Sequence, residues 1–322
     1  MELNFKIKDK SDKNLKLREA NLSTFKKKGF PNKREEDWKF TDLEKVLSEN
    51  FKELNNKQLD NKKPNVQDLK FSHNSITLIN GKFESFDFKS ENLQYENFFK
   101  INEFNLDQHL NFANELKDNR MQNLNTALHE GGFYLNIKSD YKFKYPIVIY
   151  NYFTGVLKNK IINNSETITM SKNSDATIIE YLIDESEGNF FKNTFKYINL
   201  EENSSLNYYL VNKNKSTNFF YEFSKVKLFK NSNFKKYLFT SGMKFGKFES
   251  NIKLNGINSC SEVYSGLFLG INNHQEIKTN IQHLKPNCES HQDIKNVLTS
   301  GSKGVLGVPS ILSFVRSLYL YF

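Results

Sequence analysis

The feature that most restricts the fold of this chain is a long succession of strand-like runs between Phe133 and Leu298. The runs alternate apolar with polar residues or are rich in β-branched and aromatic residues, which is typical of half-buried strands. Polar turn clusters separate them at 173–175, 201–205, 231–233 and 255–258. The clusters recur at intervals of about 26–30 residues, and no helix-length periodic segment lies between them. This pattern argues against a doubly wound α/β sheet and predicts an all-β domain, either a sandwich or a solenoid.

The first part of the chain is predicted to be helical. Ser11 is expected to cap a helix that ends in the lysine run 26–28 and Gly29, because cations near the last carbonyls and a residue tolerant of positive φ end helices. A second helix is expected to open at Thr41, which can form a capping-box pair with Glu44.

The residues between these helices and the strand-rich region have mixed character. Residues 56–70 are polar and predict a loop, whereas 75–83 predicts a hairpin around Asn-Gly. Leucines over 106–116 predict a helix, and 124–128 predicts a short one that ends before two glycines. The expected parts of the chain are a helical region 1–70, a mixed lead-in 71–132, a β core 133–304 and an atypical apolar tail 305–322.

Composition excludes several classes of protein. The mean hydropathy of −0.65 excludes a protein with many membrane spans. The net charge is +9, but no arginine-rich stripe with interleaved aromatic residues occurs, so we expect no nucleic-acid partner. Two cysteines, Cys260 and Cys288, make no disulfide framework and indicate a reducing compartment. The N-terminal residues carry no apolar signal segment, so we predict a cytoplasmic protein without a membrane partner.

The sequence contains none of the common catalytic signatures. It has no phosphate-binding GxxxxGK[ST] loop, so we do not expect it to hydrolyse ATP, and we predict that it is not an enzyme. The acids Asp184, Glu185 and Glu187 stand beside Gly188 and predict a solvated loop. His129 is expected at a helix end, where a protonated ring would interact favourably with the helix dipole.

A late group of His and Cys residues is the main candidate for metal chemistry. Imidazole and thiolate ligands suit iron, iron–sulfur clusters and zinc. However, the spacing of these residues matches no structural zinc pattern and lacks a C-x-x-C pair. We therefore expect a buried thiol beside hydrogen-bonded histidines, and keep His283, Cys288 and His274 as metal candidates, with His291 in the same stretch.

The segment PNKREEDWKFTDL at 31–43 and several later segments together resemble the SufB/SufD family, and its SufD branch most closely. In the first segment, Arg34, Trp38 and Thr41 match the family's junction between two helices. Trp38 would be its packing anchor and Thr41 its cap. The later matches are Leu124-Asn125, Ala127-Leu128, Gly132, Pro146-Ile147, Thr177–Tyr181, Asn193, Leu254-Asn255-Gly256, Gly266-Leu267-Phe268, His274, His283, Ser290 and Lys295.

The resemblance implies a fold and a function. The fold is a right-handed parallel β-helix after an N-terminal α-helical region. The function is that of a non-catalytic scaffold in the SufBCD complex, with a SufB-like subunit and a SufC-like ATPase as partners. An iron–sulfur cluster is implied at the level of the complex, and no cofactor is expected to bind stably to this chain alone.

The resemblance stops near Gly304. The family continues with another rung and a C-terminal helical domain, which we expect to be missing here, with impaired SufC binding as a result. Residues 304–322 lack Lys, Asn, Asp and Glu, so a truncation by frameshift or premature ending is one hypothesis.

Two other functions stay open at this point. One is a β-helix carbohydrate-active enzyme, which would need carboxylates aligned on one solenoid face. The other is a membrane-associated β protein that uses the apolar tail.

Overall fold

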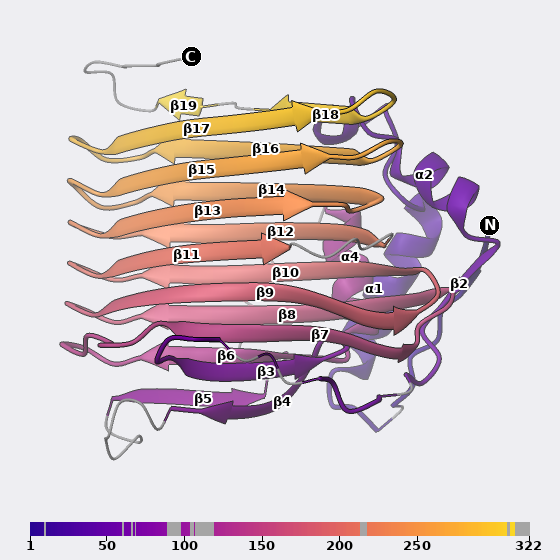
Figure 1. Cartoon of the computed structure of the whole chain (residues 1–322), viewed down its shortest axis with the longest axis horizontal. Helices are drawn as coiled ribbons and strands as arrows, with labels where there is room; N and C mark the ends of the chain where they lie inside the picture. The colour runs from indigo at the N-terminus through magenta and orange to yellow at the C-terminus, as the bar shows by residue number, and fades with distance from the viewer. Residues whose placement is uncertain are drawn as a thin grey trace.

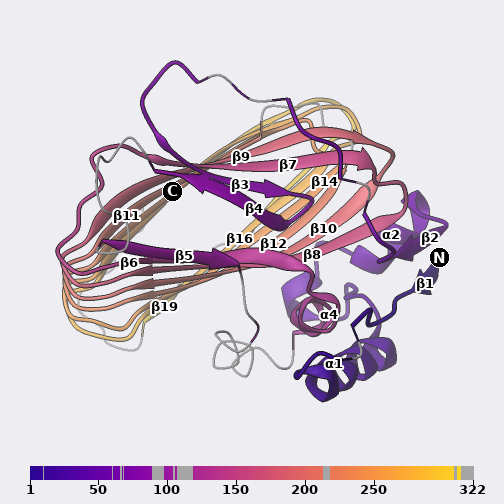
Figure 2. The ribbon, with the colours of Figure 1, turned by 90° about the horizontal axis from the view of Figure 1, so that it is seen from below.

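The computed structural model describes residues 1–9, 11–59, 61–65, 67, 69–88, 98–103, 106, 119–212, 218–307 and 310–312. Over these residues the chain is mainly β and forms a right-handed solenoid of about six turns, which confirms the predicted fold class (Figure 1). A small helical region lies against one side of the solenoid (Figure 2). The solenoid also decides between the two all-β architectures that the strand pattern allowed.

Two sheets form the long walls of the solenoid. Sheet A contains β1 (Glu2–Asn4), β2 (Glu53–Asn55), β5 (Phe99–Glu103), β6 (Gly131–Ile137), β8 (Lys160–Met170), β10 (Phe190–Leu200), β12 (Phe219–Leu228), β14 (Phe245–Leu254), β16 (His274–His283), β18 (Lys303–Gly307) and β19 (Ser310–Leu312). Sheet B contains β3 (Asn74–Ile79), β4 (Lys82–Asp87), β7 (Ile147–Val156), β9 (Asp175–Glu187), β11 (Ser205–Asn212), β13 (Asn233–Ser241), β15 (Cys260–Leu269) and β17 (Glu289–Leu298). From β7 to β18 consecutive strands alternate between the sheets, so each rung of the solenoid takes one strand from each wall and pairs in parallel with the next rung.

Antiparallel strands occur only at the start of the solenoid within the described residues. β3 and β4 form the predicted hairpin, and its turn residues Asn80 and Gly81 have φ of 50° and 80°. These left-handed conformations are what a tight hairpin turn requires. β5 pairs antiparallel with β6. These strands cover the edge where the parallel stack begins.

A ladder of asparagines fixes one corner of the solenoid. Asparagine with φ between 53° and 58° recurs at positions 173, 203, 231, 258 and 287. Asn203 Nδ2 donates to Asn173 Oδ1 at 2.9 Å, and Asn231 Nδ2 donates to Asn203 Oδ1 at 2.9 Å. Asparagine tolerates the left-handed conformation that a sharp turn needs. This explains why polar turn clusters recur once in each rung.

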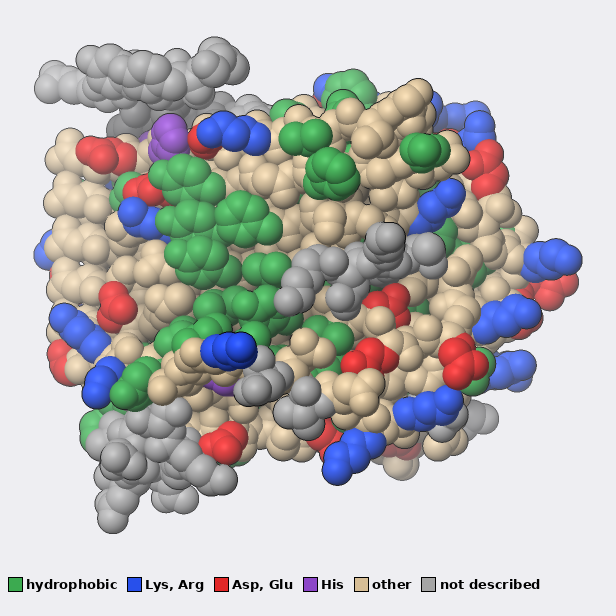
Figure 3. Space-filling view, in the orientation of Figure 1, with side chains coloured by type: hydrophobic (Ala, Val, Ile, Leu, Met, Phe, Trp, Pro, Cys, Tyr) green, Lys and Arg blue, Asp and Glu red, His purple; other side chains and the backbone are tan. Residues whose placement is uncertain are grey.

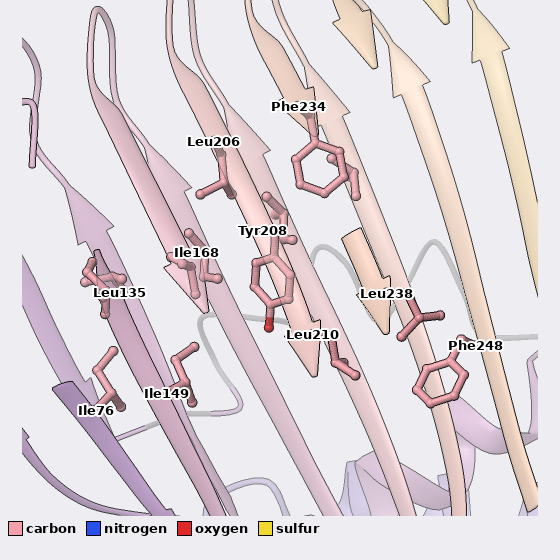
Figure 4. Packing of buried hydrophobic residues seen from close by; sticks show 14 of the residues in the cluster. Ile76, Leu135, Ile149, Ile168, Leu206, Tyr208, Leu210, Phe234, Leu238 and Phe248 are labelled. Carbon is pink, nitrogen blue, oxygen red and sulfur yellow. The ribbon is translucent and has the colours of Figure 1, made fainter. Parts of the chain in front are cut away.

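The inward-facing side chains of both sheets form the main hydrophobic core. Because strands pair in register, equivalent residues stack in columns, as in Ile168, Ile198, Val226, Ile252 and Ile281 of sheet A. Figure 4 shows part of this packing between the sheets. Full burial of each such side chain contributes about 1.5–3 kcal/mol to stability. A stack of this kind is the reason that short strands, none of which could fold alone, hold together.

The helical region covers the outer face of sheet A. It consists of α1 (Leu15–Lys28), a 3₁₀ turn (Glu36–Trp38), α2 (Leu43–Asn50) and α4 (Arg120–Leu128). Their apolar residues pack on outward-facing aromatic residues of the strands, for example Phe30 on Phe191 and Phe51 on Phe219. This second core joins the N-terminal region to the solenoid.

Several local predictions need correction. α1 begins at Leu15 after Asn14, so Ser11 is not its cap; Ser11 bonds to Asp9 in the preceding loop instead. The predicted end of α1 at Gly29 is confirmed, with φ of 68°. α2 begins after Asp42, whose side chain accepts from the Lys45 backbone N–H at 2.9 Å. Asp42 therefore caps this helix, and the predicted capping box of Thr41 and Glu44 is wrong.

His129 ends α4, as predicted, but its side chain is buried. Burial, reinforced by the Arg18 guanidinium, lowers the pKa of His129 to about 3. The ring is neutral near pH 7, so the dipole interaction of a protonated ring does not apply. The predicted helix over 106–116 lies outside the described residues, apart from position 106.

The solenoid does not stop at Gly304. β18 and β19 both pair in parallel with β16, so residues 303–307 and 310–312 continue sheet A. This corrects the expectation that Leu306 and the following residues add nothing to the rungs. Residues 313–322 of the predicted apolar tail lie outside the described residues. Among the described helices, none is long and apolar enough to cross a membrane.

Candidate functional site

The interior of the solenoid contains an ionic network. Glu166, Lys196 and Glu222 face inward from sheet A, and Glu180, Tyr208 and Lys236 face inward from sheet B. All six side chains are buried. Charged groups are almost never fully buried unless they are paired, so this network is the most unusual feature of the core.

Lys196 lies at the centre of this network. Its ammonium group lies 3.3 Å from Glu166 Oε2 and 3.1 Å from Glu222 Oε2, and it also contacts Glu180. The Tyr208 hydroxyl lies 2.8 Å from the same nitrogen and donates to Glu180. Three carboxylates and a phenol therefore surround one buried cation.

A second lysine extends the network toward later rungs. Lys236 Nζ donates to Glu222 Oε1 at 3.2 Å and to the hydroxyls of Ser224 and Ser250 at 3.1 Å each. A third, Lys192, lies 5.3 Å above the centre of the Phe153 ring. The three carboxylates and three ammonium groups balance in charge when all are ionised.

The pKa values agree with internal pairing. Burial opposes ionisation of Glu222, but Lys196 and Lys236 outweigh it and lower the pKa of Glu222 to about 2. Burial would lower the pKa of Lys196, but Glu166, Glu180 and Glu222 raise it well above the usual value. Both groups are therefore ionised across the physiological range. Both groups are buried and paired within the core, so the network is expected to stabilise the solenoid.

A second ionic network lies beneath the segment PNKREEDWKFTDL, on the outer face of sheet A. Lys247 of β14 is fully buried, lies 3.0 Å from Glu249 and pairs with Glu276 of β16 at 2.5 Å. Its ammonium group also donates to the Asp37 carbonyl at 3.0 Å and lies 4.5 Å from the centre of the Trp38 ring. Trp38 is buried as predicted, and its ring packs against Tyr221 at 5.3 Å.

Thr41 belongs to this second network instead of capping a helix. Its hydroxyl donates to Glu276 Oε2 and lies 3.1 Å from His274 Nε2. Burial, reinforced by the ammonium groups of Lys303 and Lys247, lowers the pKa of His274 to about 4. The His274 ring is therefore neutral at pH 7, and it joins the N-terminal segment to the late rungs.

Arg34, the remaining residue of the predicted junction motif, is exposed. Its backbone N–H donates to Asn32 Oδ1 at 3.1 Å, which shapes the turn before the 3₁₀ helix. The arginine that holds the junction is Arg120 of α4. It bonds to the carbonyls of Lys28 and Phe30 and lies 3.3 Å from Glu35. Nothing in the sequence around Arg120 indicated this role.

The late His and Cys residues do not come together. His274 faces the helical region, whereas His283 faces inward at the end of β16 and bonds to Ser290 at 2.9 Å. Cys288 lies at the asparagine corner, 3.2 Å from the Gly256 carbonyl and 3.3 Å from Ser259 Oγ. His291 is exposed on the outer face of sheet B, beside Tyr264.

These positions bear on metal binding in two ways. In the part of the chain that the structure describes, no three His, Cys, Asp or Glu side chains are placed to hold one metal ion. Burial raises the pKa of the Cys260 thiol to about 11, which disfavours the thiolate that iron and zinc require. Whether His274, His283 or Cys288 contacts iron in an assembly stays a hypothesis.

The acids beside Gly188 lie in a strand, not in the predicted loop. Asp184, Glu185 and Glu187 form the end of β9, and Asp184 accepts from Asn218 Nδ2 at 2.6 Å. A groove of about 580 Å³ lies elsewhere, along the asparagine corner, and contains Glu201 and Glu202.

The groove does not provide the acid pair of a glycosidase. A hydrogen bond from Lys230, with its charge, lowers the pKa of Glu202, whereas a general acid needs a raised pKa.

The ionic networks were not found from the sequence. The available signal was the two-residue period of the strands: Glu180, Lys196 and Lys236 stand two residues from the inward-facing Ile178, Ile198 and Leu238. A lysine in a strand is ordinarily taken as outward-facing, so the pattern alone did not mark them.

Comparison with known protein families gives two matches. Residues 3–149 match the SufBD protein N-terminal region, and residues 153–307 match the SufBD core domain of the SUF system for FeS cluster assembly. No curated protein matches the chain. The two matched regions follow one another and take in the helical region, the hairpin and nearly all rungs of the solenoid.

Proposed function

The chain belongs to the SufB/SufD family, which has a role in iron–sulfur cluster assembly, and on that basis we propose that it is a SufD-like, non-catalytic scaffold subunit of a SufBCD complex. Its partners would be a SufB-like subunit and a SufC-like ATPase. The iron–sulfur cluster would be cargo built by the complex, not a group bound stably by this chain alone.

One observation carries the proposal: the two family regions follow one another along the chain, the helices of the first packing on the solenoid that both regions build. The chemistry of the described residues supports a scaffold over an enzyme. Their buried carboxylates and ammonium groups are paired with each other, and the late His and Cys side chains point to different faces. A surface that presents partners, with no assembled acid–base pair, is what a scaffold needs.

Co-expression with SufB-like and SufC-like partners tests the proposal. We expect a tagged form of this chain to co-purify with both, and the purified complex to show iron–sulfur absorbance after reconstitution. The chain purified alone should show no such absorbance. Failure to co-purify with either partner, or stable cluster absorbance of the chain alone, would contradict the scaffold assignment.

A matched pair of variants separates docking from misfolding. Lys247→Met disturbs the contact between the helical region and the solenoid, whereas Lys253→Met alters an outward-facing lysine on the same strand. If the docked helical region is part of the partner surface, the first variant loses partner binding and the second retains it. Circular dichroism of both variants checks that the solenoid persists.

A further inference from the structure

The outer face of sheet B carries apolar side chains in columns that the strand register aligns. One column runs from β7 to β15 through Val148, Ile179, Tyr209, Tyr237 and Tyr264, and a second runs from β7 to β13 through Tyr150, Tyr181, Val211 and Phe239. Beside them lie the pair Tyr152 and Ile183 on the first rungs and the pair Phe268 and Val297 on the last. No described helix covers this face, because the helical region lies on sheet A (Figure 2).

An extended segment of the chain covers the first rungs of these columns. We call residues 61–73 the covering segment, with positions 66 and 68 outside the described residues. Leu69 packs on a small buried cluster whose members are Val148, Tyr150, Tyr152 and Ile183. The first residues of the columns therefore form a binding position for an apolar side chain, which we call the apolar seat.

Polar side chains on the same face of sheet B form hydrogen bonds with the backbone of the covering segment. The Asn65 N–H donates to Glu185 Oε2 at 3.1 Å, and the Gln67 N–H donates to the Tyr152 hydroxyl at 3.3 Å. The Lys62 carbonyl accepts from Thr154 Oγ1 at 2.9 Å. An extended chain thus satisfies its backbone on carboxylate and hydroxyl groups while one leucine fills the apolar seat.

The later rungs continue the columns without a cover among the described residues. The rings of Tyr209 and Tyr237 stack at 4.4 Å, and those of Tyr237 and Tyr264 at 5.1 Å. Phe239 is 45% exposed and Phe268 is 53% exposed. Figure 3 shows hydrophobic side chains gathered on the face that sheet B turns toward the viewer in Figure 1.

Like the covered part, the uncovered part of the face places a hydrogen-bond acceptor beside apolar side chains. Glu262 presents a carboxylate beside the tyrosine stack, where it accepts from Tyr264 at 2.7 Å and pairs with Lys235 at 3.0 Å. Gly266 has no side chain, and a Cβ there would lie 3.3 Å from the Phe239 ring, so the ring lies low over the strand. Stacked rings lose little conformational freedom on binding, which favours recognition.

We propose that this uncovered face, formed by Tyr209, Tyr237, Tyr264, Val211, Phe239 and Phe268, binds an extended polypeptide segment of a partner protein. The segment would pack a branched aliphatic side chain against Val211 and Phe239, as Leu69 packs on the first rungs, and would donate backbone N–H groups to Glu262 and the tyrosine hydroxyls. The covering segment is the internal precedent: the same columns already hold an extended chain in this way. The proposal does not depend on the role in cluster assembly.

Exposed apolar patches of this continuity mark interaction sites in soluble proteins. A second folded copy of the chain is the main competing occupant. The continuity of the columns with a seat that holds an extended chain favours the peptide, because the required hydrogen-bond acceptors already stand beside the apolar residues.

The probe is a fluorescein-labelled peptide of residues 61–73, titrated with the full chain and followed by fluorescence anisotropy. We expect saturable binding that the double variant Phe239→Lys, Phe268→Lys weakens about tenfold or more. The matched control Ile271→Lys changes an exposed turn residue away from the columns and should leave binding unchanged. A peptide with Leu69→Asp should bind as weakly as the double variant.

Three outcomes would overturn the proposal. The first is absence of saturable binding to the folded wild-type chain. The second is binding that the Phe239→Lys, Phe268→Lys variant retains but Tyr152→Ala loses, because the peptide would then be exchanging with the covering segment at its own seat. The third is concentration-dependent self-association in sedimentation velocity that the double variant abolishes, because the occupant would then be a second copy. Circular dichroism confirms that each variant is folded before its binding is compared.

Discussion

Two buried lysines, Lys196 and Lys247, hold ionic networks of similar composition in different places. Lys196 lies between the two sheets, and all of its partners belong to the solenoid. Lys247 lies between sheet A and the helical region, where it meets Glu249 and Glu276 from the solenoid and Asp37 and Trp38 from the N-terminal segment.

Because of this difference, we expect the two networks to resist two different events: global unfolding of the solenoid and local release of the helical region. A charge whose partners all lie in the solenoid can lose them only when rungs separate, so the Lys196 network should report on global unfolding. The Lys247 network can be broken when the helical region leaves sheet A. Local opening of this kind has a lower free energy than global unfolding in most proteins.

The largest effect is expected for Lys196→Met, which removes the cation shared by three buried carboxylates. Breaking a buried pair by deleting one partner costs about 3–5 kcal/mol, and here more than one carboxylate is left. Urea denaturation should show a loss of that size in the free energy of unfolding. If the variant does not fold, Lys236→Met serves instead, because Glu222 keeps Lys196 as a partner. A loss under about 1 kcal/mol in either variant would contradict a structural role for the network.

Lys247→Met should cost less and act locally. It leaves Glu249 and Glu276 without their cation and removes the contact with the Trp38 ring, for an expected loss of about 3 kcal/mol. Hydrogen exchange should show faster exchange of α1 and α2 amides while β10 to β14 stay protected. Equal loss of protection across both parts would remove the distinction between the networks.

On acidification, we expect the contact between the helical region and sheet A to lose stability at a higher pH than the interior network does. The pKa of His274 is about 4 in the folded chain against 6.5 for a free histidine, so the unfolded state takes up the proton first. The stability that His274 contributes is present above pH 6.5 and is lost as pH falls through about 4. After allowance for partial exposure, the loss is about 2 kcal/mol. His129, also at the helical region, contributes in the same direction over pH 6.5 to 3.

In the interior network, Glu222 responds only at lower pH, whereas burial raises the pKa of Glu166, so protonation of Glu166 on acidification does not destabilise the fold. The pKa of Glu222 is about 2 against 4.5, so its contribution is lost as pH falls from 4.5 through 2. Proteolysis across a pH series should therefore release the helical region before the solenoid unfolds. His274→Gln should flatten the first phase, and an unchanged first phase in that variant would assign it to other groups.

The smallest changes in stability are expected for substitutions in the junction segment 31–43. Thr41→Val removes a hydroxyl that donates to Glu276, and we expect a loss of about 1 kcal/mol. Arg34→Ala should change stability by less than about 0.5 kcal/mol, because the side chain is exposed. Thermal unfolding measures both, and a larger effect for Arg34 than for Thr41 would show that the junction depends on a contact not described by this structure.

The residue pattern was sufficient to predict the strands and the turns between them because turns are local, whereas the choice of a solenoid over a sandwich came from the family resemblance. Asparagine and its polar neighbours determine a sharp turn through their own backbone preferences, and the alternation of apolar residues determines which face is buried. The hairpin at Asn80-Gly81 and the end of α1 at Gly29 were predictable for the same reason. None of these features depends on residues far away in the chain.

The networks and the cap of α2 were not predictable in this way. Lys196 is stabilised by Glu180 on the facing sheet and by Glu222 on the next strand of its own sheet, and Thr41 contacts a carboxylate more than two hundred residues away. The sequence offered Thr41 an adjacent role as a cap, and Asp42 fulfilled that role instead. Only the stacking of rungs brings such partners together, so their pairing cannot be read from local preferences.

The asparagine ladder makes this protein sensitive to chemical ageing. Each amide in the middle of the ladder both donates to the previous rung and accepts from the next, as Asn203 does between Asn173 and Asn231. Deamidation of Asn203 to aspartate would remove the donor and place a negative charge against the Asn173 oxygen. Asparagine is a heat-labile residue, so prolonged storage at high temperature should loosen neighbouring rungs together. Charge-variant chromatography followed by hydrogen exchange of the separated forms would detect this loosening, and unaltered exchange in a form deamidated at Asn203 would show that the corner does not depend on the ladder.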